Sequence, residues 1–116
     1  MCIRDRFYGS GVALVTPFSR GKIDLRAFEN LIDWQIEMMT DAIIILGTTG
    51  EPSTITAPER AALVECAVST VSGRVPLLVG AGANNTRTAV EYAIEAQALG
   101  ADGLLVVCLL YTSRCV

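Results

Sequence analysis

The sequence predicts an α/β fold built on a parallel sheet, and three observations favour this class. Short apolar segments at 12–15, 42–46, 76–79 and 104–107 recur about 30 residues apart, which is the length of a βαβ unit. The stretches between them place apolar residues at helical spacing. The chain is also 52% hydrophobic, with a mean hydropathy of +0.48. Parallel strands covered by helices have this composition, because their sheet is not exposed to water.

The first helix is predicted over 25–39. Asp24 precedes it, and a carboxylate at this position accepts hydrogen bonds from the free N–H groups of the first turn. Apolar residues then fall on one face of the helix, namely Leu25, Phe28, Leu31, Ile32, Ile36 and Met39. This stripe predicts that the helix packs against the sheet through one face.

The second helix begins with a capping box. Thr56 stands three residues before Glu59, so that each side chain can bond the backbone of the other residue. Pro58 lies in the first turn, where a missing N–H group costs no helical hydrogen bond. Gly73 is predicted to end the helix, because glycine readily adopts the left-handed conformation found after helices.

The third helix is predicted over 86–99, after Asn85 and before Gly100. The whole series is therefore β-α-β-α-β-α-β, and such strands form right-handed βαβ units in a parallel sheet. Four strands and three helices fit the beginning of a (β/α)₈ TIM barrel and also fit a doubly wound open sheet. Periodicity alone does not choose between these two folds.

Composition argues against several other classes. The net charge is −3, histidine is absent and no lysines or arginines cluster, so no nucleic-acid partner is expected. The apolar segments are far shorter than the roughly 18 residues of a membrane span, and the start of the chain has no secretory signal. The four cysteines, at 2, 66, 108 and 115, lack the spacing of a zinc site. We therefore expect a cytoplasmic protein with no metal, no disulfide framework and no membrane partner.

The two ends of the chain are expected to be translated sequencing adaptor. Codons for residues 1–6 can be chosen so that their reverse complement encodes Cys-Leu-Leu-Tyr-Thr, which is the sequence at 108–112. One more codon of this inverted repeat gives Ser113. We therefore predict that residues 1–6 and 108–116 are not native sequence, and that 7–107 is the N-terminal part of a barrel or open sheet.

The candidate site lies after the second apolar segment, at Gly47, Thr48, Thr49 and Gly50. In both candidate folds, ligands bind at the C-terminal ends of the strands. The glycines permit a tight turn whose N–H groups can face an anion. The threonine hydroxyls add groups that both donate and accept hydrogen bonds. The segment predicts a small cradle for a carboxylate, although an ordinary strand-to-helix turn has the same composition.

Other candidates are weaker. Gly80 and Gly82 begin a dinucleotide-binding pattern, but Asn85 stands where its third glycine belongs. Lys22, the only lysine, is predicted to be solvated in a polar turn and not to form a Schiff base. Cys66 is expected to be buried in its helix and unreactive. Trp34 and Tyr92 are expected to be packing residues.

Four segments resemble the dihydrodipicolinate synthase (4-hydroxy-tetrahydrodipicolinate synthase) family. They are FYGSGVALVTPF at 7–18, GTTGE at 47–51, GAGAN at 80–84 and GADG at 100–103. The resemblance covers 7–107 in order and spacing. It implies the (β/α)₈ barrel, of which this chain would hold about the first four strands and three helices.

The resemblance also implies an activity. Members of this family condense pyruvate with aspartate semialdehyde in lysine and diaminopimelate biosynthesis, through a Schiff base on a lysine of a later strand. They use no metal or organic cofactor and are usually homotetramers. Thr48 would be the hydroxyl of a proton relay, Thr49 would bind the pyruvate carboxylate, and Gly47 and Gly50 would shape the binding loop.

The resemblance also sets the rival hypotheses. The Schiff-base lysine would lie beyond residue 107, so the fragment itself would be inactive. The Thr48–Thr49 pair favours the synthase over N-acetylneuraminate lyase, a relative that more typically has serine followed by threonine there. A non-catalytic half-barrel that binds a partner is the alternative of a different class.

Overall fold

The computed structural model describes residues 7–107. The two segments predicted to be adaptor sequence, 1–6 and 108–116, lie outside the described residues, so their origin stays a prediction. The main sheet is parallel and has four strands in the order β1 (Gly11–Ala13), β4 (Ala42–Ile45), β5 (Leu77–Gly80) and β6 (Gly103–Leu105). The apolar segments therefore form strands in the order in which they occur in the sequence.

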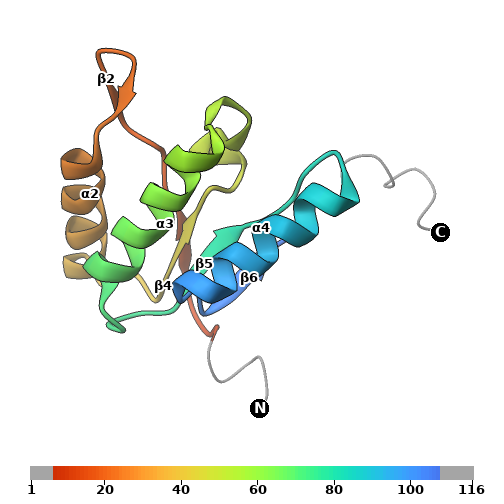
Figure 1. The fold of residues 1–116 in the computed structure, drawn as a ribbon. Helices are drawn as coiled ribbons and strands as arrows, with labels where there is room; N and C mark the ends of the chain where they lie inside the picture. The colour runs from red at the N-terminus through yellow and green to blue at the C-terminus, as the bar shows by residue number, and fades with distance from the viewer. Residues whose placement is uncertain (1–6, 108–116) are drawn as a thin grey trace.

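Three helices connect these strands, namely α2 (Leu25–Glu37), α3 (Ala57–Val71) and α4 (Thr86–Leu99). All three lie on the same side of the sheet (Figure 1). A doubly wound sheet reverses its strand order and carries helices on both faces. Successive strands with helices on one face instead form the wall of a (β/α)₈ barrel. The structure thus confirms the partial barrel and decides against the open sheet.

The helix ends follow the predicted local signals closely. Helix α4 spans the predicted residues, with the Asn85 side chain accepting from two N–H groups of the first turn. The capping box of Thr56 and Glu59 is present at the start of α3. Helix α3 ends one residue earlier than the Gly73 prediction implied, because Ser72 already adopts the left-handed conformation (φ 47°). Helix α2 is shorter than predicted and ends at Glu37.

Two features were not predicted. A short antiparallel hairpin pairs β2 (Phe18–Ser19) with β3 (Lys22–Ile23) before α2. Two 3₁₀ turns, η1 (Thr48–Gly50) and η2 (Pro52–Thr54), lie between β4 and α3. Both features occupy the side of the sheet where the strands end, and η1 with its N-cap Gly47 forms the predicted site.

The core fills the space between the sheet and the helices. Its largest fully buried side chains are Phe28, Ile32, Ile43, Ile45, Leu63, Leu77, Val64 and Val79. The face of the sheet that points away from the helices is less buried, and the strand register explains why. Ile44 and Leu78 pair in register with Ala13 and Gly103, point away from the helices and are only half-buried. This second face is the inner wall of the barrel.

Candidate active site

The predicted site forms a tight loop directly after β4. The Gly50 N–H donates to the Gly47 carbonyl at 2.9 Å, and the Glu51 N–H donates to the Thr48 carbonyl at 3.1 Å. Leu46 and Glu51, which flank the loop, both have left-handed backbones, with φ of 55° and 54°. Residues other than glycine adopt this conformation at a cost, and the surrounding structure must hold them there.

Two neighbouring segments hold the loop in place. The buried Thr16 hydroxyl, after β1, donates to the Gly50 carbonyl at 2.7 Å. On the other side, Gly80 at the end of β5 packs directly on Leu46. A β-carbon at Gly80 would lie 1.9 Å from the Leu46 carbonyl oxygen, so only glycine permits this approach. The loop is thus fixed from both neighbouring strands.

The threonine side chains of the loop are available to a ligand. Thr48 and Thr49 are both exposed, and neither hydroxyl makes a hydrogen bond with any residue in 7–107. The Gly50 N–H is already donated to Gly47. The expectation that both glycine N–H groups face an anion is therefore wrong for Gly50, because the 3₁₀ turn uses that donor. The threonine hydroxyls are the side-chain donors that the loop offers.

A cleft of about 620 Å³ lies beside the loop, between the ends of β4, β5 and β6 and the start of α4. Gly47 and Thr48 line it, whereas Thr49 and Gly50 are not among its lining residues. Its further polar lining consists of Glu51, Ser53, Thr54, Asn84, Thr86 and Tyr92. Hydroxyl and amide groups predominate among these polar side chains, and apolar side chains such as Leu46 and Leu105 form much of the remaining lining. The cleft therefore suits a small ligand held by a few hydrogen bonds within a largely apolar pocket.

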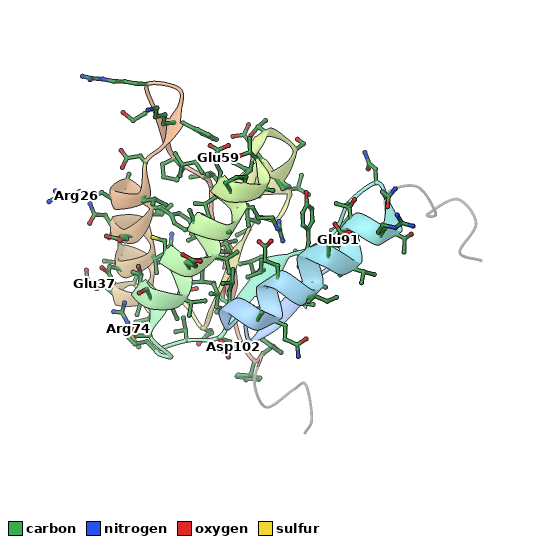
Figure 2. The ribbon with its side chains drawn as sticks, in the orientation of Figure 1. Arg26, Glu37, Glu59, Arg74, Glu91 and Asp102 are labelled. Atoms are coloured by element: carbon green, nitrogen blue, oxygen red, sulfur yellow. The ribbon has the colours of Figure 1, made fainter. Side chains whose placement is uncertain are left out.

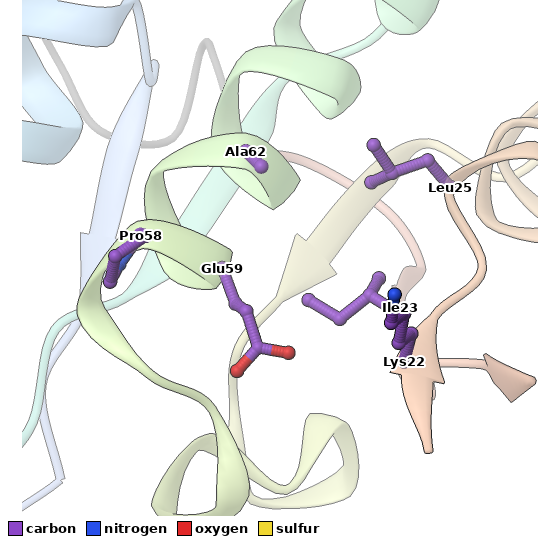
Figure 3. Close-up of a pocket in the computed structure, with 6 residues that line it drawn as sticks. All are labelled: Lys22, Ile23, Leu25, Pro58, Glu59 and Ala62. Atoms are coloured by element: carbon purple, nitrogen blue, oxygen red, sulfur yellow. The ribbon is translucent and has the colours of Figure 1, made fainter. Parts of the chain in front are cut away.

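A second, more open pocket lies between the hairpin and the start of α3 (Figure 3). It measures about 330 Å³ and includes Lys22 and Glu59. The Glu59 carboxylate accepts from the Thr56 hydroxyl at 2.7 Å and from the Thr56 N–H at 3.0 Å. These hydrogen bonds lower the pKa of Glu59. Since Glu59 is engaged in capping α3 and none of the predicted site residues lines this pocket, we place the candidate site in the larger cleft.

A family model supplies the decisive comparison. The model described as the dihydrodipicolinate synthetase family matches residues 6–114, nearly the whole chain. The chain belongs to this family. The resemblance seen in the four sequence segments is confirmed.

Similar proteins agree with this assignment. The chain is 58% identical over 101 residues to the 4-hydroxy-tetrahydrodipicolinate synthase of Alkaliphilus oremlandii, and 46% identical over 101 residues to that of Clostridium novyi. Each alignment covers 87% of this chain but only 35% and 34% of these two relatives. The chain therefore spans about a third of the length of the curated relatives that it matches.

Solved structures of the dihydrodipicolinate synthase family have the same fold over this part. The enzyme from Aquifex aeolicus superimposes with a TM-score of 0.84 at 45% identity, covering 86% of this chain and 34% of that one. A chloride-inhibited synthase from Acinetobacter baumannii, complexed with pyruvate, gives a TM-score of 0.82 at 40% identity, covering 84% and 34%. The partial barrel is therefore one portion of the dihydrodipicolinate synthase fold.

Sequence reasoning missed two residues that support the site in this family member. Thr16 was not singled out as a candidate residue, but its hydroxyl holds the candidate loop. Arg60, on α3, is only 4% exposed and bonds the Gly80 carbonyl at the rim of the cleft. The sequence did contain a signal for the burial of Arg60. Arg60 lies one helical turn before Leu63, Ala67 and Val71, on the same buried face of α3.

Within residues 7–107, no three His, Cys, Asp or Glu side chains gather as a metal site would require. No helix in this range is long and apolar enough to cross a membrane.

Proposed function

We propose that this chain is the N-terminal part of a (β/α)₈ synthase that condenses pyruvate with aspartate semialdehyde through a lysine Schiff base. One observation carries the proposal. The loop at the C-terminal end of β4 is fixed from both neighbouring strands and carries two exposed threonine hydroxyls, which have no hydrogen-bond partner in residues 7–107. The chain that bears them is 58% identical to a relative named 4-hydroxy-tetrahydrodipicolinate synthase.

The proposed chemistry needs groups that move protons. A lysine amine attacks the pyruvate carbonyl and releases water, which gives a Schiff base. Loss of a methyl proton turns the Schiff base into an enamine, whose carbon attacks the aldehyde carbon of the second substrate. Thr48, whose hydroxyl can donate and accept, would relay these protons. The protonated Schiff base accepts the electron pair of the broken C–H bond, so the proposal requires no metal or organic cofactor.

Thr49 would bind the pyruvate carboxylate, and Gly47 and Gly50 would shape the loop around it. A related synthase with a TM-score of 0.82 was solved with pyruvate, which supports pyruvate as the first substrate here. The direct contacts of these residues with substrate stay predictions. The family tetramer and the cytoplasmic location, which the sequence led us to expect, also stay predictions.

The 116 residues alone are proposed to be inactive. Their only lysine, Lys22, lies exposed in β3 of the hairpin. A Schiff-base lysine stands in a desolvated or electrostatically positive site. An exposed hairpin provides neither condition. The reactive lysine would therefore come from a part of the full-length protein outside this chain.

The test begins with the complete reading frame at the source locus, expressed as the full-length protein. We expect borohydride to trap a pyruvate adduct on one lysine, detectable by mass spectrometry, and we expect condensation with aspartate semialdehyde. Thr48→Val should lower kcat by roughly 100- to 10,000-fold, the usual range for a lost proton-transfer group. Thr49→Val should mainly raise the KM for pyruvate.

Thr70→Val is the matched control. Its hydroxyl bonds the Cys66 carbonyl within α3 at 2.8 Å, so both kinetic constants should stay close to wild type. Trapping of pyruvate together with turnover of N-acetylmannosamine would instead identify an N-acetylneuraminate lyase. A full-length protein that traps no pyruvate would refute the aldolase proposal and favour the non-catalytic binding protein.

A further inference from the structure

A buried cation lies between the cleft and the helices. Arg60 of α3 is 4% exposed, and its Nη2 donates to the Gly80 carbonyl at 2.5 Å. Its guanidinium carbon lies 4.0 Å from the centre of the Tyr92 ring on α4. In the described part of the chain, no carboxylate lies within ion-pairing distance of Arg60; the ion pair found there joins Arg74 to Asp33.

This arrangement is energetically expensive for the fold. Burial lowers the pKa of the Arg60 guanidinium, and electrostatic interaction with Glu95, followed by that with Tyr92, opposes this shift. The Arg60 Nε and the Glu95 Oε1 are both buried and have no hydrogen-bond partner among residues 7–107. An apolar residue would fill a helix–sheet interface at lower cost. Unsatisfied buried groups of this kind therefore call for an explanation other than packing.

The contacts of Arg60 lead to the site loop. Gly80 and Tyr92 both line the cleft, and Gly80 packs directly on the Leu46 carbonyl. Leu46 has a left-handed backbone, with a φ of 55°, and is followed at once by Gly47 and Thr48. The Gly80 carbonyl is thus held by the guanidinium while the Gly80 backbone supports the strained residue that begins the loop.

We propose that Arg60 is a positioning residue for the Thr48 loop, acting through Gly80 and Tyr92. The guanidinium N–H groups hold the Gly80 carbonyl at the end of β5 by a hydrogen bond. The flat face of the guanidinium holds the Tyr92 ring, which lines the cleft, by a cation–π contact. The catalytic part of this inference rests on the proposed function, because it assigns the supported loop to the proton relay. Arg60 itself touches no substrate in this scheme.

Three variants should distinguish a role of Arg60 in positioning the loop from a role in stabilising the fold alone. Arg60→Met keeps the aliphatic stem but removes the donors, and Arg60→Lys keeps one donor and the charge. Arg74→Met is the control, because Arg74 lies just past the other end of α3 from Glu59 (Figure 2) and pairs with Asp33 at 2.6 Å. All variants are made in the full-length protein.

Kinetics give the first readout. In Arg60→Met we expect kcat to fall roughly 10- to 100-fold, as small displacements of catalytic groups do, while the KM for the aldehyde stays within twofold. Arg60→Lys should recover part of that loss, and Arg74→Met should match wild type. An Arg60→Met enzyme with wild-type kcat would overturn the inference while leaving the proposed function intact.

Hydrogen exchange gives a readout that does not depend on activity. The peptide covering residues 46–51 should exchange at least several-fold faster in Arg60→Met than in wild type or Arg74→Met. Unchanged exchange in this peptide would overturn the positioning role.

A second variant is available if Arg60→Met does not fold. Tyr92→Leu removes the ring that supports the guanidinium, and the same kinetic and exchange measurements then decide. If the wild-type protein condenses no aldehyde with pyruvate, the proposed function and the catalytic role of Arg60 fail together, and exchange alone decides whether Arg60 holds the loop.

Discussion

Single hydrogen bonds at the strand ends give the site its shape. The Thr16 hydroxyl and the Gly50 carbonyl are 34 residues apart in the sequence and meet in a buried bond of 2.7 Å. Such a bond supplies orientation at little net energy, but removing one partner leaves a buried acceptor unsatisfied. At the residue scale, therefore, the groups that support the loop matter as much as the loop itself.

Thr16→Val should destabilise the full-length protein by about 1–3 kcal/mol, because valine keeps the shape of the side chain and leaves the Gly50 carbonyl without its donor. Thr16→Ser, which keeps the hydroxyl, should lose less. Denaturant unfolding monitored by circular dichroism measures both changes. Equal stability of the valine variant and wild type would mean that water replaces the hydroxyl.

Cys66 should react slowly with iodoacetamide in the folded protein. Burial raises the pKa of its thiol above the usual 9.0, and the nearby Glu29 carboxylate adds to this rise while a hydrogen bond with Thr70 opposes it. A higher pKa means less thiolate, the reactive form, at any given pH. Peptide mapping should show faster alkylation in urea. Glu29→Gln should also speed alkylation, and an unchanged rate in that variant would exclude Glu29 as a cause.

The same shift makes a prediction about pH. Because the folded pKa lies above the unfolded value of 9.0, the unfolded chain ionises first as pH rises. The stability that Cys66 contributes is thus fully present below pH 9.0 and is lost above it. Cys66→Ala should weaken this alkaline decline in the free energy of unfolding. An identical decline in wild type and variant would show that other groups cause it.

At the scale of elements, local chemistry sets the helix ends. The capping box of α3 joins Thr56 and Glu59 through three hydrogen bonds, two of them to the backbone. These bonds satisfy N–H groups that the first turn of a helix otherwise leaves free. Because they involve only neighbouring residues, they form wherever α3 itself forms.

Thr56→Ala should therefore lower the free energy of unfolding by roughly 1 kcal/mol, with Thr56→Ser as the control that retains the cap. The loss should depend on pH. The Thr56 hydrogen bonds lower the pKa of Glu59 below its ordinary 4.5, so the stabilisation is present above pH 4.5 and disappears as pH falls through the folded pKa. Chemical unfolding at neutral and acid pH tests this. A loss that stays constant across that range would contradict the role of Glu59.

At the scale of the whole molecule, the partial barrel leaves apolar surface uncovered. Strand β6 is an edge of the sheet. Its Leu104 shares a register position with the buried Val79 yet remains 40% exposed. Open edges with apolar side chains pair readily with other chains. In the dihydrodipicolinate synthase fold, further strands of the barrel would cover this edge.

The 116 residues expressed alone should therefore self-associate. Leu104→Lys should reduce the associated fraction in sedimentation velocity, because lysine on an edge strand opposes pairing. Val90→Lys is the matched control, because Val90 is 52% exposed but belongs to helix α4 and not to a strand. A monomeric wild-type chain, or an equal effect of both lysines, would show that edge pairing does not drive association.

The sequence by itself determined the order of strands and helices and most helix ends. Helix α4 was predicted over its observed residues because its start at Asn85 and its end near Gly100 depend on adjacent residues only. The candidate loop at Gly47–Gly50 also came from the sequence, since glycines and threonines after a buried strand form a tight turn there, and its role in binding stays a prediction. The family resemblance, which the match over residues 6–114 confirms, then favoured the barrel over the doubly wound open sheet.

Only the tertiary structure decided which distant groups meet. Trp34 was expected to pack but is 51% exposed, because the buried face of α2 is set by Phe28 and Ile32. Tyr92 does pack, with the buried Arg60 as its partner across α3 and α4. Thr16 bonds Gly50 because β1 and β4 are neighbours. Each of these contacts joins residues far apart in the chain, so no local pattern encodes it, and the packing of the helices on the parallel sheet determines it.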